Sequence, residues 1–480
     1  MHGHFLAADG GGPRALFQIY IHQARFQGNF IVCHIPPLNT GHNPGHPIIL
    51  PKRPRPRQRG LYIIHLRTAL TMKRTTGNPL HRTGKRLSVS LLWDCNQRCG
   101  FCAKGRPPRG VRPRLSLEEA LAVLRAGRRD GYDFLALDGG EPSIYPELRQ
   151  VVLKALELGY RSVNILTNGT GLAAGGLLRG FPARHRKRLS FCVSLHSHLP
   201  AVSDKLTGSP GSFAKTLEGI RAARGAGFTF SLYHVITALN WRALPAYAAF
   251  VAKNFPEAGA VTFSYMFPAE HLRAGLGLYP RLGPAAAPLA EGARLLQARG
   301  LRVELSACGV IPLCLARGSE RILLNTALEK RFMTFDTMKM EPLPFLDADF
   351  NGRTKKKAPR CAGCFVDRAC GGIWKFYAGK FGLSELRPFK GDYFRKLPGS
   401  GGASLDLASS AAAPDPLAPA MASLIGLRYR GVSKLNLLNE AALGGAAEKL
   451  RTFAREAGFT LVPAGRRLSP KPRRAGPRRR

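Results

Sequence analysis

The chain has 480 residues, of which 45% are hydrophobic and 10 are Cys. This length and apolar content exclude a disulfide-stabilised miniprotein and a wholly disordered chain. The sequence contains no run of about 18 apolar residues, so we expect no membrane-spanning helix. Residues 1–9 also lack the basic and then apolar plan of a secretory signal peptide. We therefore expect a cytoplasmic protein, in which clustered cysteines bind metal more often than they form disulfides.

The net charge of +42 comes from 72 Lys and Arg against 30 Asp and Glu, and it is not confined to the ends of the chain. Such a field attracts anionic partners, which include RNA, acidic peptides and phosphorylated metabolites. A solvated basic surface explains the same charge equally well, because net charge reports on solubility and association rather than on fold.

The first 85 residues form a segment that we expect to be disordered or a doubtful leader. They contain frequent His, Gly and Pro, a Pro/Arg run at 51–59 and little periodicity. We expect Met72 to be a more natural start of the protein than Met1.

From Arg86 to about residue 300, strand-like runs alternate with helix-like stretches. Strands are expected at 87–92, 133–138, 162–167, 189–195, 228–236 and 261–265, and helices at 116–129, 146–158, 212–225, 243–254 and 285–299. Ser116 and Glu119 fit a capping box at the start of the first helix. The alternation predicts an α/β fold, a partial (β/α)6 barrel over residues 86–300, with its chemistry at the carboxyl ends of the strands.

The remainder of the chain is expected to contain two further parts. Residues 301–397 form a smaller cysteine-rich domain, and residues 398–480 form a linker, a short helical segment and a basic tail. The linker is predicted from the Gly, Ala, Ser and Pro content of 398–420, and the helix from the pattern of 439–457.

The most specific motif is the triplet Cys95, Cys99 and Cys102, with spacing C-x3-C-x2-C, in the loop after the first strand. Three thiolates on one short loop can hold three irons of a [4Fe–4S] cluster and leave the fourth iron open to a chelating ligand. Structural zinc is the alternative, but it requires four closed ligands. The nearest downstream His or Cys lies beyond residue 180.

With the aromatic Phe101 before its last cysteine, the triplet resembles the signature of radical S-adenosylmethionine (radical SAM) enzymes. Further motifs follow in the order typical of that family. They are Asp138–Pro142 (DGGEP), Thr167–Gly169, Ser194–His196, Asp204–Phe213 and Val235–Asn240. The resemblance covers residues 86–270.

The resemblance implies that Cys95, Cys99 and Cys102 are the catalytic cluster ligands. It also implies S-adenosylmethionine (SAM) contacts from Phe101, Gly139, Gly140, Glu141, Pro142, Thr167, Asn168, Ser194 and His196. Without the resemblance, Gly139–Pro142 reads as a tight βα turn, Asn168 as part of an Asn-Gly turn, and His196 as an ordinary surface or core histidine. The family's chemistry implies reductive cleavage of SAM to a 5′-deoxyadenosyl radical and a one-electron donor such as a flavodoxin or ferredoxin.

A second cysteine set has Cys361, Cys364 and Cys370 in the spacing C-x2-C-x5-C, with Cys308 and Cys314 upstream. Four of these five can close a second [4Fe–4S] cluster or a zinc site. The set resembles the auxiliary-cluster extensions called SPASM or twitch domains. Position 374 is Trp where a full SPASM pattern has Cys, which favours one twitch-like auxiliary cluster. Either Cys308 or Cys314 completes it, and Cys314 is preferred because Pro312 stiffens its approach.

We therefore predict a radical SAM oxidoreductase or maturase that acts on an unidentified substrate, which is a peptide, a cofactor precursor or RNA. The alternative is a basic nucleic-acid-binding protein with structural metal sites, for which zinc without iron would be the sign.

Overall fold

The computed structural model describes residues 85–104, 112–267, 277–305, 311–317, 320, 333–336, 341–343, 354–408, 410–411 and 415–463, together with three strands near the N-terminus. It divides into two units, residues 1–79 and 80–480. In the first, β1 (Gln23–Gln27), β2 (Phe30–His34) and β3 (Ile48–Pro51) pair antiparallel. Outside these three strands, the expectation of a disordered or doubtful leader at residues 1–85 stays a prediction. The other residues of 1–84 lie outside the described part.

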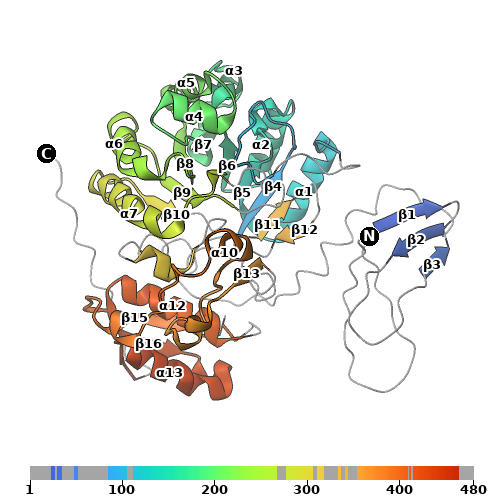
Figure 1. The fold of residues 1–480 in the computed structure, drawn as a ribbon. Helices are drawn as coiled ribbons and strands as arrows, with labels where there is room; N and C mark the ends of the chain where they lie inside the picture. The colour runs from blue at the N-terminus through green and yellow to red at the C-terminus, as the bar shows by residue number, and fades with distance from the viewer. Residues whose placement is uncertain are drawn as a thin grey trace. The chain divides into compact units, whose positions relative to one another are not determined.

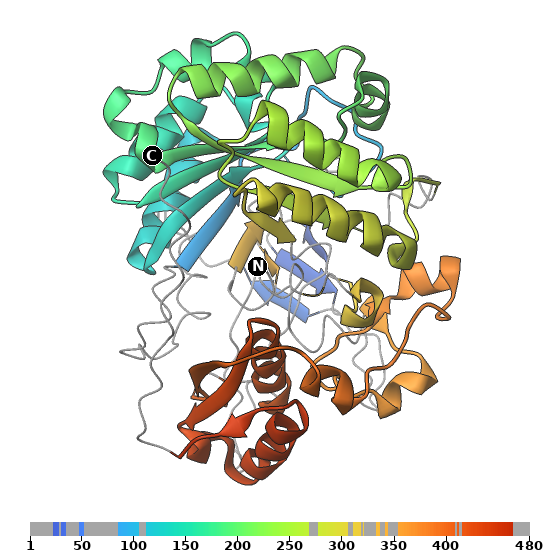
Figure 2. The same cartoon turned by 90° about the vertical axis from the view of Figure 1, so that its left-hand side faces the viewer.

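A nine-stranded sheet, in the order β10-β9-β8-β7-β6-β5-β4-β11-β12, forms the centre of the larger unit (Figure 1). Its strands are β4 (Lys85–Ser90), β5 (Tyr132–Asp138), β6 (Ser162–Thr167), β7 (Leu189–Ser194), β8 (Thr229–Ile236), β9 (Val261–Tyr265), β10 (Val303–Leu305), β11 (Met333–Asp336) and β12 (Glu341–Leu343). Neighbours from β10 to β11 pair parallel, and only β12 pairs antiparallel. The sheet curls without closing (Figure 2). The predicted α/β fold with a partial barrel is confirmed.

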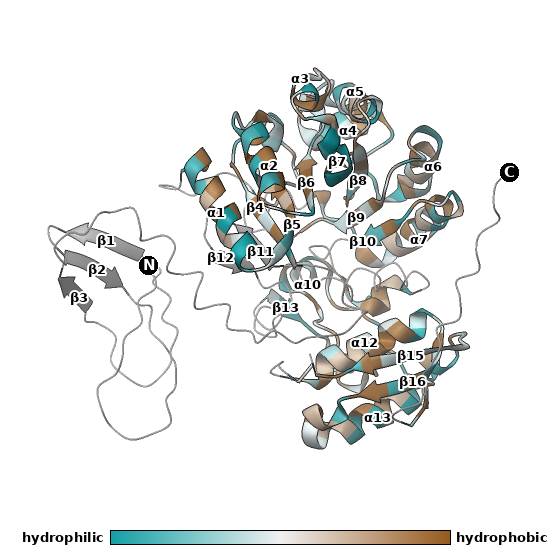
Figure 3. Cartoon of the chain, turned by 180° about the vertical axis from the view of Figure 1, so that it is seen from behind, coloured by the Kyte–Doolittle hydropathy of each residue, from teal (hydrophilic) through white to brown (hydrophobic). Residues whose placement is uncertain are grey.

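Helices connect consecutive strands and cover the outer face of the sheet. They are α1 (Leu117–Arg129), α2 (Leu148–Glu157), α3 (Gly176–Arg179), α4 (Pro200–Thr207), α5 (Ser212–Gly225), α6 (Leu244–Asn254) and α7 (Leu282–Ala298), with short 3-10 turns η3 (Pro142–Ile144), η4 (Thr170–Leu172), η5 (Ala183–Arg188) and η6 (Trp241–Ala243). The capping box is confirmed, because Ser116 Oγ accepts from Glu119 N and the Glu119 carboxylate accepts from Ser116 N. Brown and teal surfaces alternate around α1 and α2 in Figure 3, as expected of amphipathic helices.

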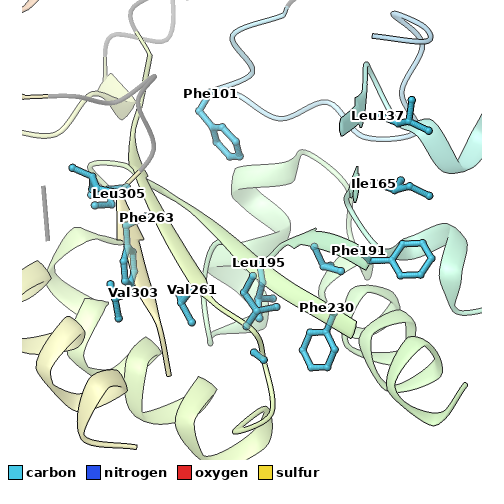
Figure 4. Close-up of a cluster of buried hydrophobic side chains, with 14 of the residues drawn as sticks. Phe101, Leu137, Ile165, Phe191, Leu195, Phe230, Val261, Phe263, Val303 and Leu305 are labelled. Carbon is cyan, nitrogen blue, oxygen red and sulfur yellow. The ribbon is translucent and has the colours of Figure 1, made fainter. Parts of the chain in front are cut away.

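The main core lies between the sheet and these helices. Alternate strand residues such as Val163, Ile165 and Leu232 are buried there, and Figure 4 shows the equivalent side chains from β5 to β10. Burying each such side chain stabilises the fold by about 1.5–3 kcal/mol. The residues between them, such as Asn164 and Tyr233, are half-buried on the inner face of the sheet. The inner face is therefore more open and more polar than the outer one.

Residues 401–461 form a compact βαβαβ unit with its own core. Its elements are β15 (Gly401–Asp406), α12 (Leu417–Tyr429), β16 (Val432–Leu438), η11 (Glu440–Ala446), α13 (Ala447–Glu456) and β17 (Thr460–Leu461), with the three strands parallel. The predicted linker at 398–420 is therefore wrong. The Ala- and Leu-rich stretch from 417 is a good helix former whose apolar residues build the second core. The predicted helix at 439–457 appears as η11 and α13, and the tail at 464–480 lies outside the described residues.

Short elements join the barrel to this unit. They are η9 (Leu313–Ala316), β13 (Lys355–Lys356), η10 (Pro359–Gly363), β14 (Ile373–Trp374), α10 (Lys375–Phe381) and α11 (Gly391–Arg395). In the described part of the chain, no helix has the length and apolar character needed to cross a bilayer.

Candidate functional site

The three cysteines of the triplet lie on the loop that leaves β4. Cys95 and Cys102 are exposed, Cys99 is half-buried, and all three are free thiols. Burial, and then the charges of Cys102 and Cys95, raise the pKa of Cys99 to about 12, so the three sulfur atoms lie close enough to interact. This donor set suits a cluster that binds each thiolate through a different iron and supplies positive charge to ionise it. Among the described residues, no three His, Cys, Asp or Glu side chains are arranged around a single metal ion.

The C-terminal end of α4 holds the cysteine loop from one side. Arg98 N donates to Thr207 O at 2.9 Å, and Gly100 N donates to Leu206 O at 3.1 Å. The next residue, Gly208, has a φ of +60°, and a Cβ there would lie 2.7 Å from Arg98 O. The motif Asp204–Phe213 therefore acts as a support for the loop.

The glycine pair after β5 holds the loop from the other side. Gly140 N donates to Leu92 O at 2.7 Å, and Glu141 N donates to Asp94 O at 2.9 Å. A Cβ on Gly140 would lie only 1.9 Å from Asp94 O, and Gly139 has a φ of +151°. The structure thus explains both glycines by close packing against the cysteine loop. Their approach to SAM stays a prediction.

Glu141 lies inside the protein and bridges two strand ends. Its carboxylate is 1% exposed and accepts hydrogen bonds from Thr167 Oγ1 at 2.5 Å, Asn168 N at 2.7 Å and Ser143 N at 2.9 Å. Burial raises the pKa of this carboxyl, and these hydrogen bonds act in the opposite direction. A buried carboxylate is stable only where donors satisfy it, and these three donors do so. The predicted contact of Glu141 with SAM stays a prediction. The adjacent Pro142 is buried at the start of η3.

Asn168 connects the end of β6 to the cysteine loop. Its Nδ2 donates to Asn96 Oδ1 at 2.7 Å, and its Oδ1 accepts from Thr170 N at 3.0 Å. Burial raises the pKa of Cys95, and a hydrogen bond from the Asn168 side chain acts in the opposite direction. Asn168 therefore lies beside the first cysteine, and its contact with SAM stays a prediction.

Phe101 and His196 connect the loop to the end of β7. Their rings meet edge to face, with centroids 4.6 Å apart. Val235 N donates to His196 Nδ1 at 3.1 Å, so we assign the proton of the neutral ring to Nε2. Burial lowers the pKa of His196 to about 3, which keeps the ring uncharged at neutral pH. Ser194 is half-buried at the end of the same strand.

Two site residues that sequence reasoning left unassigned close the cysteine loop. Lys104 Nζ donates to Ser90 Oγ at 2.6 Å and lies 3.7 Å from Asp138 Oδ1. Asp138 also accepts from Ser88 Oγ at 2.8 Å. The loop is thus tied back to the end of the strand from which it starts. The sequence signal that could have identified this pair was a lysine two residues after Cys102 and an acidic residue directly before Gly139.

Cysteines of the second set line one pocket in the described part of the chain. They are Cys314, Cys361, Cys364 and Cys370. Burial, and then the charges of the other three cysteines, raise the pKa of Cys314 to about 11. Cys314 thus lies with the three downstream cysteines, whereas Cys308 lies outside the described residues, so the choice between the two stays a prediction.

Backbone groups and apolar side chains shape this pocket. Phe389 N donates to Cys364 Sγ at 3.3 Å, and Gly372 N donates to Cys370 Sγ at 3.3 Å. The side chains of Leu313, Val366 and Leu386 contribute apolar walls. N–H donors aimed at sulfur and a largely apolar wall fit an iron–sulfur cluster, whose potential depends on both.

Comparison with known proteins assigns the central part of the chain. Residues 93–251 match the model of the Radical SAM superfamily, which confirms the resemblance seen in the cysteine triplet. Molybdenum cofactor biosynthesis protein 1 of Bos taurus is 34% identical over 147 residues, which are 30% of this chain and 22% of the relative. GTP 3′,8-cyclase of Xanthomonas axonopodis pv. citri is 32% identical over 159 residues, which are 32% of this chain and 45% of the relative. The chain thus matches less than half the length of these curated relatives.

Solved structures with a similar arrangement include SuiB of Streptococcus suis bound to S-adenosylmethionine. The TM-score is 0.47 at 14% identity, covering 64% of this chain and 76% of that one. Native anSMEcpe with bound AdoMet has a TM-score of 0.38 at 14% identity, covering 54% of this chain and 74% of that one.

Proposed function

We propose that this chain, with a radical SAM domain at residues 93–251, is an enzyme that reductively cleaves SAM at a [4Fe–4S] cluster held by Cys95, Cys99 and Cys102. When bound, the cluster and SAM supply a 5′-deoxyadenosyl radical that abstracts hydrogen from the substrate. One observation carries the proposal. Three interacting thiols lie on a loop that hydrogen bonds fasten to α4 and to the end of β5.

The chain's own residues serve as supports and as ligand contacts. Gly140, Glu141 and Thr167 also form hydrogen bonds that support the loop and the strand ends. The proposed contacts with SAM are Phe101, Gly139, Gly140, Glu141, Pro142, Thr167, Asn168, Ser194 and His196. His196 suits this role because its Nε2–H is a neutral donor on a ring fixed by Val235 N.

The second cysteine set is proposed to hold one auxiliary [4Fe–4S] cluster, as in a twitch-like extension. Cys314, Cys361, Cys364 and Cys370 supply one ligand for each iron, so no iron stays open to a substrate. Such a closed cluster carries electrons or stabilises the fold. Structural zinc is the alternative at this site.

The proposed substrate is a cofactor precursor, because the two matched relatives are named for molybdenum cofactor biosynthesis and for GTP cyclisation. A peptide or RNA is the alternative. A flavodoxin or ferredoxin is the proposed electron donor, and the reducing cytosol is the proposed location.

Iron counting and SAM cleavage test this proposal together. The full chain is reconstituted anaerobically with iron and sulfide, and dithionite and SAM are then added. We expect about eight irons per chain, the content of two clusters, and formation of 5′-deoxyadenosine detected by mass spectrometry. Cys99→Ala should lose about four irons and all 5′-deoxyadenosine.

Cys192→Ala is the matched control, because Cys192 is a buried residue of β7 outside both sets. It should keep both readouts. Zinc without iron, together with no 5′-deoxyadenosine, would contradict the enzyme and support the nucleic-acid-binding alternative.

A further inference from the structure

Three consecutive lysines precede the second cysteine set and occupy three different environments. Lys355 and Lys356 form β13, which pairs antiparallel with β14 so that Lys355 lies opposite Trp374 and Lys356 opposite Ile373. Lys355 is 9% exposed, whereas Lys356 and Lys357 are exposed.

The charges of these lysines are compensated differently. Lys357 lines the pocket of the four cysteines, and its Nζ lies 2.9 Å from Asp367 Oδ1 and forms an ion pair. Lys355 Nζ lies 4.7 Å from the centre of the Trp374 ring. No carboxylate in the described ranges forms an ion pair with Lys355, and no hydrogen bond is found for its ammonium there. A buried ammonium without a counter-ion is costly, and a cation–π contact offsets only about 0.5–2 kcal/mol.

The four-cysteine set lies beside β13 and is a source of negative charge. The turn that carries Cys370 packs directly against β13, since a Cβ on Gly372 would lie 2.5 Å from Lys356 O. Burial lowers the pKa of Lys355, and the Cys370 thiolate acts in the opposite direction. A cluster bound by four thiolates is anionic, and reduction adds one more negative charge.

We infer that Lys355 is a positioning residue of the auxiliary site, whose buried ammonium is the counter-charge of the cluster and raises its reduction potential. This inference rests on the proposed auxiliary cluster. A fixed positive charge favours the reduced form, because attraction grows with each negative charge added to the cluster.

A redox titration of the reconstituted full chain, followed by electron paramagnetic resonance, tests the role. Lys355→Met should lower the equilibrium constant for reduction of the auxiliary cluster about tenfold, which is about 59 mV more negative for one electron. The cluster of the Cys95 loop should keep its potential. Lys355→Arg should restore the wild-type value, because it keeps the charge.

Lys356→Met is the matched control, since it removes the same charge from an exposed position of the same strand. It should leave both potentials unchanged. Loss of the auxiliary irons from Lys355→Met, with retention in Lys355→Arg, would also support the role of the charge.

Two results overturn the inference while leaving the auxiliary cluster intact. One is an unchanged potential in Lys355→Met. The other is an equal shift in Lys355→Met and Lys355→Arg, which would indicate altered packing on Trp374. About four irons in the wild-type chain, or zinc at the second site, contradicts the proposed cluster itself and this role with it, and the metal count separates that outcome from the first two.

Discussion

Individual polar residues around the cysteine loop are largely satisfied by the protein itself. Glu141 accepts three hydrogen bonds, Asn168 donates to Asn96, and Lys104 donates to Ser90. A buried polar group that loses its partner costs about 1–3 kcal/mol, so these contacts hold the loop in one geometry.

The buried His196 makes stability sensitive to acid. Its pKa is about 3 in the folded chain because of burial, whereas a histidine in an unfolded chain titrates near 6.5. Between these values only the unfolded chain binds the proton, so stability is full above about pH 6.5 and falls as the pH drops. At 1.36 kcal/mol per pH unit, His196 should lower the free energy of unfolding by about 2 kcal/mol when the pH falls from 7 to 5.

Urea unfolding of the apoprotein at pH 7 and pH 5 measures this loss. His234 is buried beside His196 with its pKa also lowered, so His196→Gln should reduce the pH-dependent loss without abolishing it. His185, in η5, is the comparison: burial and the neighbouring Arg184 and Arg188 also lower its pKa, but the side chain is much less buried, so His185→Gln should reduce the loss less than His196→Gln does. The same pH dependence in His196→Gln and wild type would contradict the prediction.

The sequence motifs indicated which site residues lie near one another. Phe101, Asn168 and His196 all lie in loops that follow the ends of parallel strands. They did not indicate which way each side chain points. The pairing of Lys104 with Asp138 joins residues far apart in the chain and depends on the path of the loop between them. The inward position of Glu141 likewise depends on donors supplied by a different strand.

The turn between α4 and α5 lies directly against the cysteine loop. The substitution Gly208→Ala should weaken the contact between this turn and the cysteine loop in two ways. A φ of +60° disfavours alanine by about 1–2 kcal/mol, and the added Cβ would lie 2.7 Å from Arg98 O. We expect loss of about half the iron of the reconstituted chain, from the Cys95 loop, and loss of 5′-deoxyadenosine formation.

Gly211→Ala separates the two causes. Gly211 also has a positive φ, +76°, but nothing lies within 4 Å of its Cβ position. It should therefore lower thermal stability by a similar amount and keep the iron of the Cys95 loop. If both variants lose that iron equally, backbone strain rather than contact with the loop is responsible.

Long periodic elements were predicted well, and short or glycine-rich ones were not. The helices of the barrel have apolar positions at helical spacing, and the predicted ranges agree with α1, α2, α5, α6 and α7 to within a few residues. β10 has three residues, too few for a pattern. β15 reads Gly-Gly-Ala-Ser-Leu-Asp, which has low strand propensity, and it forms because β16 pairs with it along its whole length.

In the larger unit as a whole, two hydrophobic cores meet at the second cysteine set. Cys314 and Cys361 pack against the barrel core, and Cys314, Cys364 and Cys370 pack against the core of the βαβαβ unit. The sequence could not predict this, since the stretch that begins the βαβαβ unit has the composition of a linker. The auxiliary site consequently depends on a part of the chain that contributes no cysteine.

Phe453→Ala tests that dependence. Phe365, directly after Cys364, stacks on Phe453 of α13 with ring centroids 4.4 Å apart and an interplanar angle of 11°. Removing a buried Phe ring costs about 3–5 kcal/mol, and here the support of Cys364 is lost as well. We expect loss of the auxiliary irons, counted after reconstitution, with 5′-deoxyadenosine formation retained.

Phe459→Ala is the control, because Phe459 belongs to the same core but faces Arg428. Equal iron loss in both variants would mean that overall stability of the βαβαβ unit, and not the stack beneath Cys364, holds the auxiliary site.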